Sequence, residues 1–528
     1  MSIVVIGYND AAHIAEAVRS ALAQGPVVAE VIAVDDASTD GTGTVLNQLA
    51  ARHPALRVIH RSVNSGGCGT PRNQGLRAAG SRYVMFLDSD DVLPAGAAST
   101  LLGAALRHDA PVAAGLCVRR ELPRGHDTHW QPALYREAAL LRRPEDRPAL
   151  LHDTLCVGKL YARDFLTRHR ITFPEGPFRY EDFVFTARLL AASPRIATVP
   201  DRVYLWHVRR DAARPSISLD RESVANWRAR VQAHRQAVRI LMDAGRDRLA
   251  LAARVKFLDH DLRLYTRELP LRGPGYRQAW WHLTRDLLAS YPAEELAAAR
   301  APARWIARVV LAADRPRDLD RLAQLAARPA RLLPPYARLD GHPVWATDLP
   351  SVPLDGLAGP DAKPVRRLPV TVDGSLRLTT WPPRAELTLH IHELYDRLAE
   401  AEPTAIEVEL RLRGTGTTRS RSAPLIPAGP GWTARLPFEL KPVAAGPMPL
   451  VWDVRVRLRC RQGSLRTAVR AAGPTRRRML PSPRHGLLLV QPYATAGGSL
   501  AVRMAPGPRG MWAVLRGRLR RRRQGARP

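Results

Sequence analysis

The stretch Phe86-Leu87-Asp88-Ser89-Asp90-Asp91 decides the fold, because three carboxylates follow directly on the apolar run 83–87. A short apolar run rich in β-forming residues is typical of a buried strand. In open α/β sheets, ligands bind beyond the carboxyl ends of the strands, which is where these acids lie. Crowded carboxylates repel one another unless a cation offsets them, and hard oxygen ligands suit Mg²⁺ or Mn²⁺. The stretch therefore predicts a metal-assisted site for the phosphates of a nucleotide.

Three more strand-and-loop units precede this one. Strands are predicted over 2–7, 30–34 and 56–60, and helices over 13–24, from Ser38 or Thr39 to about 54, and over 70–79. Strands that alternate with helices at this spacing predict parallel βαβ units with right-handed crossovers. The loops that follow the strands should then share one edge of one sheet. We interpret Asp40, in one of these loops, as a helix-capping residue.

Four motifs in this region resemble those of family 2 glycosyltransferases and occur in the family's order and spacing. They are Ile-Gly-Tyr-Asn (6–9), Val-Asp-Asp-Ala-Ser-Thr-Asp-Gly-Thr (34–42), Asn-Ser-Gly-Gly (64–67) with Pro-Arg-Asn-Gln-Gly-Leu (71–76), and Phe-Leu-Asp-Ser-Asp-Asp (86–91). The resemblance covers roughly the first 95 residues and implies a GT-A fold, a nucleotide-diphosphate sugar donor and a divalent metal. Gly7 stands where proline is usual, and Pro71 where alanine usually precedes Arg-Asn. Both are loop positions, so neither departure affects the expected chemistry.

Chemistry and the resemblance together suggest roles for residues of the donor site. Asp36, with Asp35 as the nearby alternative, would accept a hydrogen bond from the base or ribose. Tyr8, which precedes Asn9 in the first loop, would pack on the base. Arg72 opens a helix beside the expected phosphates, where a guanidinium and free backbone N–H groups both favour an anion.

Asp88 and Asp90 form the DxD pair implied by the resemblance, which predicts Mn²⁺ or Mg²⁺ as the cofactor. Asp90 is the expected direct metal ligand, and Asp91 lies close by. An ordinary turn or capping role is the alternative for each acid. The crowding of the acids at one strand end favours the metal site.

Inverting transfer also needs a base that takes a proton from the acceptor hydroxyl. The candidate segment is Arg179-Tyr180-Glu181-Asp182-Phe183-Val184-Phe185, whose aromatic residues would reduce the hydration of the carboxylates and raise their pKa. It resembles the family's Glu-Asp motif, which opens a helix under the acceptor site. By that resemblance Asp182 is the base, and Glu181 orients it or contacts the acceptor. The alternative is a solvated first helical turn, where acids favour the helix dipole.

Two further stretches resemble elements of the same family. Gly158-Lys159-Leu160-Tyr161 resembles a Lys-Leu-Tyr element ahead of the acidic motif, and Lys159 is equally consistent with a surface lysine. The run Tyr-Leu-Trp-His-Val-Arg-Arg (204–210) resembles the start of the loop that closes over the diphosphate. There His207 and Arg210 would stabilise the leaving phosphates, and Ser216 would donate a hydrogen bond.

The composition indicates a large, basic protein. The chain has 528 residues and a formal net charge of +31, so several domains are expected. Its four cysteines show neither metal nor disulfide spacing and suit a reducing compartment. No apolar run approaches the length of a membrane span, and the sequence begins directly with a strand. We therefore expect a cytoplasmic protein, with peripheral binding at the inner face of the cell membrane as a further expectation.

Changes in composition and hydrophobic periodicity along the chain predict the domain organisation. The expected segments are a GT-A domain over 1–218 (nucleotide-sugar half 1–95, acceptor half 96–218), a helical region over 219–328, a linker over 329–369, a β-sandwich-like domain over 370–505 and a basic tail over 506–528. Trp280, Trp281 and Trp305 are expected to pack between helices. Strand alternation over 406–413 and 454–460 predicts one charged, solvated face, and Asp373-Gly374 predicts a hairpin turn.

This layout is similar to that of teichoic-acid-type wall glycosyltransferases of Gram-positive bacteria. The similarity suggests that the β-domain binds the polymer or forms a homo-oligomer. In the tail, the apolar run 511–515 precedes an arginine cluster, a combination that suits an anionic membrane surface. A disordered charged terminus is the alternative.

The sequence thus predicts an inverting, metal-dependent hexosyl- or N-acetylhexosaminyltransferase. It would move a sugar from a nucleotide-diphosphate donor, a UDP-sugar being expected, to a hydroxyl of a cell-envelope polymer or glycolipid. A nucleic-acid-binding protein is the alternative suggested by net charge alone, but the arginines are scattered through the whole chain. A nucleotidyltransferase on the same sheet is a further alternative, which would not explain Glu181 and Asp182.

Overall fold

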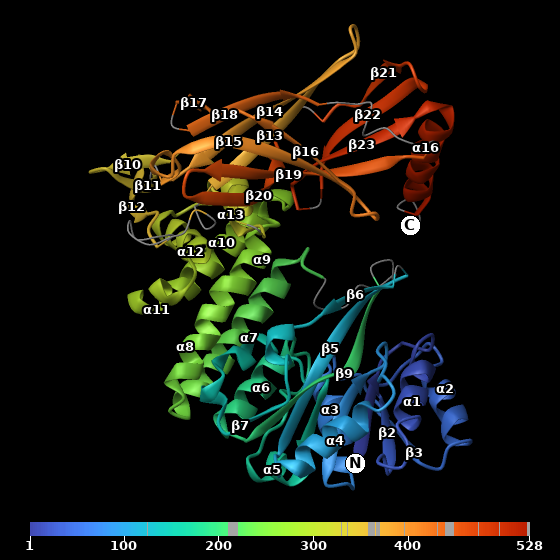
Figure 1. Cartoon of the computed structure of the whole chain (residues 1–528). Helices are drawn as coiled ribbons and strands as arrows, with labels where there is room; N and C mark the ends of the chain where they lie inside the picture. The colour runs from blue at the N-terminus through green and yellow to red at the C-terminus, as the bar shows by residue number, and fades with distance from the viewer. Residues whose placement is uncertain are drawn as a thin grey trace. The chain divides into compact units, whose positions relative to one another are not determined.

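The computed structural model forms two compact units, which Figure 1 shows. One comprises Met1–Tyr265 and Arg272–Ala299, and the other comprises Thr266–Leu271 and Arg300–Pro528. The structure describes residues 1–123, 125–209, 220–328, 330–334, 336–356, 365, 370–394, 397–429, 431–438, 448–473, 475–495 and 497–524.

The first unit is built on one mixed sheet whose order is β3-β2-β1-β4-β8-β5-β9-β7, with β6 paired to β5. Its strands are β1 (Ser2–Gly7), β2 (Glu30–Asp35), β3 (Leu56–His60), β4 (Tyr83–Asp88), β5 (Val112–Leu122), β6 (His126–His129), β7 (Ala139–Leu141), β8 (Lys159–Ala162) and β9 (Ile196–Arg209). From β3 to β4 all pairs are parallel, as predicted, and β8 is antiparallel to both of its neighbours. Because β1 and β4 are parallel and in register, with Ile6 opposite Asp88, the loops after them meet at one edge.

Helices connect these strands. They are α1 (Ile14–Leu22), α2 (Thr42–Ala50), α3 (Gly69–Ala78), α4 (Ala97–Arg107), α5 (Arg163–Arg168) and α6 (Glu181–Ala191), with short 3₁₀ turns η1 (Pro132–Leu134), η2 (Pro144–Asp146) and η3 (Pro148–His152). Helix α2 begins at Thr42, later than Ser38 or Thr39, where it was predicted to begin. The carboxylate of Asp40 accepts a hydrogen bond from the amide of Thr42 at 3.0 Å. Asp40 therefore has the capping role expected of it.

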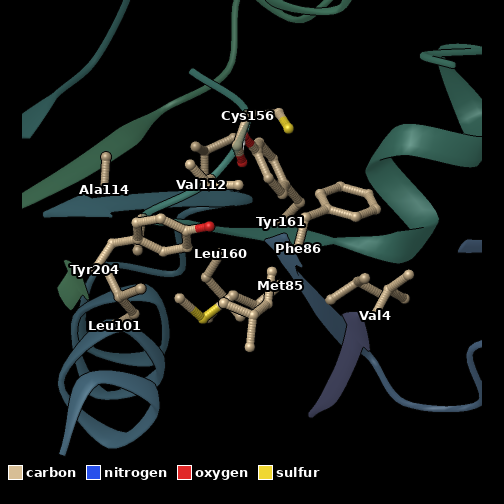
Figure 2. Packing of buried hydrophobic residues seen from close by; sticks show 14 of the residues in the cluster. Val4, Met85, Phe86, Leu101, Val112, Ala114, Cys156, Leu160, Tyr161 and Tyr204 are labelled. Carbon is tan, nitrogen blue, oxygen red and sulfur yellow. Dashed lines mark hydrogen bonds between the residues drawn. The ribbon is translucent and has the colours of Figure 1, made fainter. Parts of the chain in front are cut away.

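An aromatic cluster in the core links the two acidic segments. The ring of Phe86 in β4 lies 5.9 Å from that of Tyr161 and 6.2 Å from that of Phe185 in α6. Figure 2 shows Phe86 and Tyr161 side by side in this cluster. Phe173 stacks on Phe185 at 4.0 Å and meets Phe86 edge-on at 5.3 Å. Because the strand that ends in Asp88 and the helix that begins at Glu181 pack on the same rings, their acidic ends are held together.

A glycine contact brings the start of α3 against the loop that leads to α6. A Cβ added at Gly69 would lie 1.9 Å from the carbonyl oxygen of Pro174. One turn further, Asn73 exchanges hydrogen bonds of 2.9 Å with the backbone N–H and C=O of Phe173. Only glycine allows this approach of the two backbones, which fixes the first turn of α3 beside the start of α6.

The helices that follow the sheet belong to two different units. The first unit contains α7 (Val224–Asp243), α8 (Asp247–Lys256), the π-helix η4 (Phe257–Leu262), most of α9 (Arg263–Thr266), α10 (Pro274–Leu288) and α11 (Ala293–Ala298). The second contains η5 (Leu269–Leu271), α12 (Ala301–Ala312) and α13 (Leu319–Ala326). The prediction of one helical region over 219–328 was therefore too simple, since α7 packs on α6 of the first unit. Trp280, Trp281 and Trp305 are fully buried, as expected.

The second unit is mainly β structure. A small sheet contains β10 (Ala337–Leu339), β11 (His342–Ala346) and β12 (Leu349–Pro353), and β12 packs on α12. These strands lie inside the predicted linker 329–369, so that prediction was wrong for residues 337–353. The high density of proline and glycine there marks tight connections between short strands and does not mark an open linker.

The larger sheet has the order β17-β18-β14-β13-β20-β19-β23-β22-β21, with β15 paired to both β19 and β16. Its elements are β13 (Val370–Thr379), β14 (Arg384–Glu393), β15 (Pro403–Leu412), β16 (Thr418–Ala423), β17 (Ile426–Ala428), β18 (Gly431–Pro437), β19 (Leu450–Cys460), β20 (Gly463–Ala471), β21 (Arg478–Ser482), β22 (Gly486–Ala494) and β23 (Leu500–Pro506), with helices α14 (Arg397–Glu400) and α16 (Gly507–Gln524). In β15, Ile406 and Val408 are buried while Glu407 and Glu409 pair with arginines of β19, which confirms one apolar and one charged face.

The predicted hairpin turn at Asp373-Gly374 was wrong, because both residues lie inside β13. A Cβ at Gly374 would approach Cγ1 of Val469 to 2.4 Å, so the glycine permits close packing of β13 on β20. Asp373 forms an ion pair with Arg470 of the same neighbouring strand. Within the described residues, we find no helix with the length and apolar content needed to cross a bilayer.

We predict that Gly69→Ala lowers the free energy of unfolding of the first unit by about 1–3 kcal/mol, because the new methyl group meets a backbone oxygen that has no room to move. Thermal denaturation measures the effect. Gly103→Ala is the matched control: Gly103 also lies in a helix, α4, and a Cβ there has nothing within 4 Å, so this variant should be neutral or more stable by up to about 1 kcal/mol. Equal stability of the two variants would contradict the packing argument.

Candidate functional site

The loops at the carboxyl ends of β1 and β2 are joined by hydrogen bonds. The amide of Asn9 donates to the hydroxyl of Ser38 at 2.9 Å, and the side-chain oxygen of Asn9 accepts from the amide of Thr39 at 2.7 Å. The amide of Asp10 donates to the hydroxyl of Thr42 at 2.8 Å. The sequence predicted that these loops share one edge, and the structure brings them together there.

Asp35 and Asp36 are buried and hold the neighbouring loops. Asp35 accepts from the amide of Ser38 at 3.1 Å. Asp36 accepts from the side chains of Ser65 at 2.7 Å and Asn64 at 3.0 Å, and its carboxylate lies 2.6 Å from Nε of Arg61. The Asp36 carboxylate thus orders the glycine-rich loop 62–69, and that of Asp35 holds the loop after β2. Tyr8, by contrast, is 43% exposed at the same edge, so its ring can meet a planar ligand.

The acids after β4 divide into buried and exposed members. Asp91 is buried and accepts from the hydroxyl of Tyr204 at 2.7 Å and from the amide of His207 at 2.8 Å, so it fastens the end of β4 to β9. The side chain of Asp90 is 45% exposed. Partial burial and the charges of Asp88 and Asp10 raise the pKa of Asp90 to about 6. Asp10, which the sequence analysis did not single out, therefore adds to the acidic edge.

Arg72 connects the two acidic segments. Its guanidinium is buried and donates to Asp88 at 2.7 Å, to Glu181 at 2.5 Å and to Asp182 at 3.2 Å. The sequence predicted Arg72 beside phosphates, whereas the structure surrounds its guanidinium with three carboxylates. This ion-pair cluster is the contact that brings the candidate metal-binding acids and the candidate base into one site.

The two acids at the start of α6 differ in exposure. The side chain of Glu181 is 10% exposed and that of Asp182 is 20% exposed. Burial and the charge of Asp182 raise the pKa of Glu181 to about 7, and burial also raises the pKa of Asp182. A carboxylate with a raised pKa is a stronger base than an ordinary one. Of the two, Asp182 has the longer bond to Arg72 and the more open side chain, which suits a proton acceptor.

Lys159 is not a surface lysine. Its ammonium is buried, lies 2.9 Å from a carboxylate oxygen of Asp153 and donates to the carbonyl of Leu155 at 2.5 Å. Asp153 also accepts from the indole of Trp130 at 3.0 Å and from the hydroxyl of Tyr135. The pair therefore orders the segment between β6 and β8 on the acceptor side of the sheet.

His207 lies directly beside the acidic end of β4. One of its ring nitrogens, Nδ1, lies 3.2 Å from the backbone carbonyl of Asp90. Burial and the nearby Arg209 lower the pKa of His207, so the imidazole is uncharged at neutral pH. The predicted partners Arg210 and Ser216 lie outside the described residues.

The sequence analysis missed Arg209. Its guanidinium donates to the carbonyl of Asp90 at 2.8 Å and lies 3.4 Å from His207. The missed signal is strand periodicity: residues two apart on a strand share a face, so Arg209 lies on the same face of β9 as His207.

Asp88 and Asp90 fit a hard divalent cation. Among the residues that the structure describes, no group of three or more His, Cys, Asp and Glu side chains is arranged to hold a metal ion. Magnesium sites for nucleotides often use only one or two carboxylates together with substrate phosphates, so these two acids are a sufficient protein contribution. Burial is the largest cause of the raised pKa of Asp90, and the charges of Asp88 and Asp10 add to it; a cation would offset those charges.

Residues 2–168 match the family model described as glycosyl transferase family 2. This part of the chain therefore resembles a family 2 glycosyltransferase domain. This match confirms the resemblance drawn from the four motifs. The family 2 domain includes the whole acidic edge and Lys159, and the matched range ends before Glu181.

Curated relatives align with the N-terminal part of the chain. A poly(ribitol-phosphate) beta-glucosyltransferase of Bacillus spizizenii is 30% identical over 41% of this chain and 34% of its own length. The succinoglycan biosynthesis protein ExoO of Rhizobium meliloti is 30% identical over 42% of this chain and 64% of its own. The poly(ribitol-phosphate) beta-N-acetylglucosaminyltransferase TarS of Staphylococcus aureus is 31% identical over 40% of this chain and 36% of its own. The chain thus covers between a third and two thirds of the length of these relatives.

Solved structures extend the likeness of the fold. The crystal structure of S. aureus TarS has a TM-score of 0.55 at 18% identity and covers 96% of this chain and 85% of that one. A TarS 1–349 structure in complex with UDP-GlcNAc has a TM-score of 0.53 at 20% identity and covers 65% of this chain and 95% of that one. These matches show the fold, and they confirm the predicted order of a GT-A domain, helices and further β structure.

We predict that the stability of the wild type relative to Glu181→Gln falls as pH rises from 5 to 8. The pKa of Glu181 is raised from 4.5 to about 7 in the folded protein, so the folded state holds a proton in this window that the unfolded state has lost. That stabilising contribution is complete below about pH 4.5 and is lost as pH rises through 7, whereas glutamine cannot titrate. Melting temperatures of both proteins across the window measure the difference.

Glu175→Gln is the matched control. Hydrogen bonds from Asn73 and Arg77 lower the pKa of Glu175, so its contribution titrates below this window and the corresponding difference should be flat. A flat or rising difference for Glu181→Gln would contradict the raised pKa.

Proposed function

We propose that the chain is an inverting, metal-dependent glycosyltransferase that uses a nucleotide-diphosphate sugar. The observation that carries the proposal is the buried Arg72, which joins Asp88 on the donor side to Glu181 and Asp182 on the acceptor side. Displacement at an anomeric carbon needs a group that holds the diphosphate and a base on the opposite side of that carbon. The cluster supports both within one site.

In the proposed mechanism, Asp88 and Asp90 would hold a divalent cation, which would supply positive charge to offset that of the diphosphate. Asp182 accepts the proton of the acceptor hydroxyl while that oxygen forms the new bond to the anomeric carbon. The bond from this carbon to the diphosphate oxygen breaks, and its electron pair leaves with the nucleoside diphosphate. Arg72 keeps Asp182 oriented through its direct bond to that carboxylate, and the bonds of Arg72 to Glu181 and Asp88 hold the guanidinium in place.

His207 and Arg209 are proposed to act on the leaving group. Both contact the carbonyl of Asp90, so they lie next to the expected phosphates. A guanidinium is a suitable partner for phosphate oxygens, and an uncharged imidazole can donate a hydrogen bond. Arg210 and Ser216 are proposed to act on the same leaving group.

We further propose a UDP-sugar, glucose or N-acetylglucosamine, as the donor and a wall polymer of the teichoic-acid type as the acceptor. Two of the relatives are named as poly(ribitol-phosphate) glycosyltransferases, and one solved structure of similar fold contains UDP-GlcNAc. The net charge of +31 is suited to an anionic acceptor.

We predict that Asp182→Asn lowers kcat by about 10²–10⁴-fold with little change in donor affinity, because it removes the general base alone. Asp90→Asn should instead weaken metal-dependent donor binding. Release of nucleoside diphosphate from UDP-glucose and UDP-GlcNAc, with poly(ribitol phosphate) as acceptor and with Mn²⁺ or chelator, measures both effects.

Asp109→Asn is the control for loss of a carboxylate. The Asp109 side chain is 76% exposed at the other end of the sheet and has a positive φ of 43°, which asparagine tolerates. This variant should keep full activity. Full transfer by Asp182→Asn would overturn the proposed mechanism.

We also propose that α16 binds an anionic membrane surface. The helix contains Arg509, Arg516, Arg518 and Arg520 to Arg523 with no acidic residue, and the ring of Trp512 is exposed and covered on one side by the guanidinium of Arg516 at 3.4 Å. Basic residues near such a surface contribute roughly 1 kcal/mol each. The chain should therefore sediment with vesicles containing phosphatidylglycerol and not with purely zwitterionic vesicles, and Trp512→Ala should weaken this binding. Equal sedimentation with both kinds of vesicle would refute the proposal.

A further inference from the structure

A second buried charge cluster lies in the helices behind α6. Asp261 is fully buried in the π-helix η4, and its carboxylate lies 2.7 Å from Nε of Arg230 and 2.9 Å from Nζ of Lys256. Lys256 and Asp261 are five residues apart. The i→i+5 repeat of a π-helix places such residues on the same side, whereas the 3.6-residue turn of an α-helix would separate them. The π-helical turn thus completes the cluster.

The two cations of this cluster face the aromatic residues that flank the acids of the site. The guanidinium of Arg230 lies 4.5 Å from the ring centre of Tyr180, and the ammonium of Lys256 lies 4.3 Å from that of Phe183. Tyr180 and Phe183 directly precede and follow Glu181 and Asp182 in the sequence. A cation is attracted to an aromatic ring face more strongly in a desolvated place than at an exposed site.

Tyr180 has a backbone conformation that needs such support. It is the residue before α6, with φ of 63° and ψ of 36°, a left-handed conformation that is unfavourable for a bulky residue. Its hydroxyl donates to the side-chain oxygen of Asn226 at 2.6 Å, and the hydroxyl of Tyr265 donates to the same atom. Asn226 and Arg230 lie one turn apart on α7, so one face of this helix contacts both the hydroxyl and the ring of Tyr180.

We propose that Arg230, acting with Asp261 through Tyr180, is a positioning residue for Asp182. The conformation of Tyr180 sets the direction in which α6 begins, and hence the direction of the carboxylate two residues later. This inference rests on the proposed function, because it assigns the helices after the sheet a part in presenting the base. It gives a reason for the packing of α7 on α6 within one unit.

Arg230→Gln is the sharpest test. It leaves Asp261 paired with Lys256, whereas removing Asp261 would leave two buried cations uncompensated and threaten folding. We expect kcat to fall at least tenfold while the KM and the dissociation constant for the donor change less than threefold, because the donor site stays intact. Tyr180→Phe, which removes only the hydroxyl, should lower kcat in the same direction by a smaller factor.

Glu295→Gln is the matched control. Glu295 pairs with Arg254 at 2.5 Å in the same helices, its side chain is 17% exposed, and the pair includes neither Tyr180 nor Phe183. This variant should keep both kcat and KM. If Arg230→Gln loses no more activity than Glu295→Gln, or loses donor affinity in parallel with kcat, the positioning role is refuted.

Amide exchange separates this inference from the proposed function. The amide of Phe183 donates to the carbonyl of Tyr180 at 3.1 Å, so its exchange reports whether the start of α6 is held. We expect Arg230→Gln to speed exchange in the peptide containing Phe183 at least tenfold and Glu295→Gln to leave it unchanged. Unchanged exchange in Arg230→Gln would overturn the positioning role. A wild type without transferase activity would refute the proposed function while leaving the exchange result to stand.

Discussion

The ion pairs of the buried Arg72 are the interaction on which the first unit depends. Its guanidinium lies 3% exposed among Asp88, Glu181 and Asp182, which come from segments about a hundred residues apart. A buried guanidinium without partners would cost several kcal/mol, and loss of the guanidinium would leave three carboxylates, of which Glu181 is buried, without a cation. The two acidic segments therefore cannot separate without leaving charges uncompensated. The electrostatic requirement joins the two halves of the site more specifically than apolar packing could.

Packing contacts position the segments that carry these charges. The rings of Phe86, Phe173 and Phe185 join β4, the loop before α6 and α6 itself. Gly69 lets α3 approach this loop closely enough for Arg72 to enter between the acids. Apolar burial supplies the non-directional driving force, and the hydrogen bonds of Asn73 to Phe173 select one register of the two segments.

The sequence predicted the local features of this unit and missed the long-range ones. The strands that end in Gly7, Asp35 and Asp88 were evident because period and turn chemistry are local properties of a chain. The acids 181 and 182 were found through a motif with apolar neighbours. The partners of Arg72 and the burial of Lys159 against Asp153 were not predictable, because each depends on a contact between segments whose approach only the folded chain defines. Gly374 shows the same limit, since the residue pair typical of a hairpin turn serves packing against Val469 inside a strand.

The charge balance around Arg72 differs from that around Asp261 in a way that fits the proposed site. Around Arg72, three carboxylates meet one guanidinium, and nearby Asp90 adds further negative charge. Besides burial, the charge of Asp88 contributes to the raised pKa values of Asp90, Glu181 and Asp182. Such a site gains stability from any cation or proton that it binds. Around Asp261 two cations meet one carboxylate, and the faces of Tyr180 and Phe183 take up the excess positive charge. Because the carboxylate and the rings already balance the two cations, the second cluster can stay closed and rigid. The first cluster has excess negative charge, which favours a site that exchanges protons and ligands with solvent.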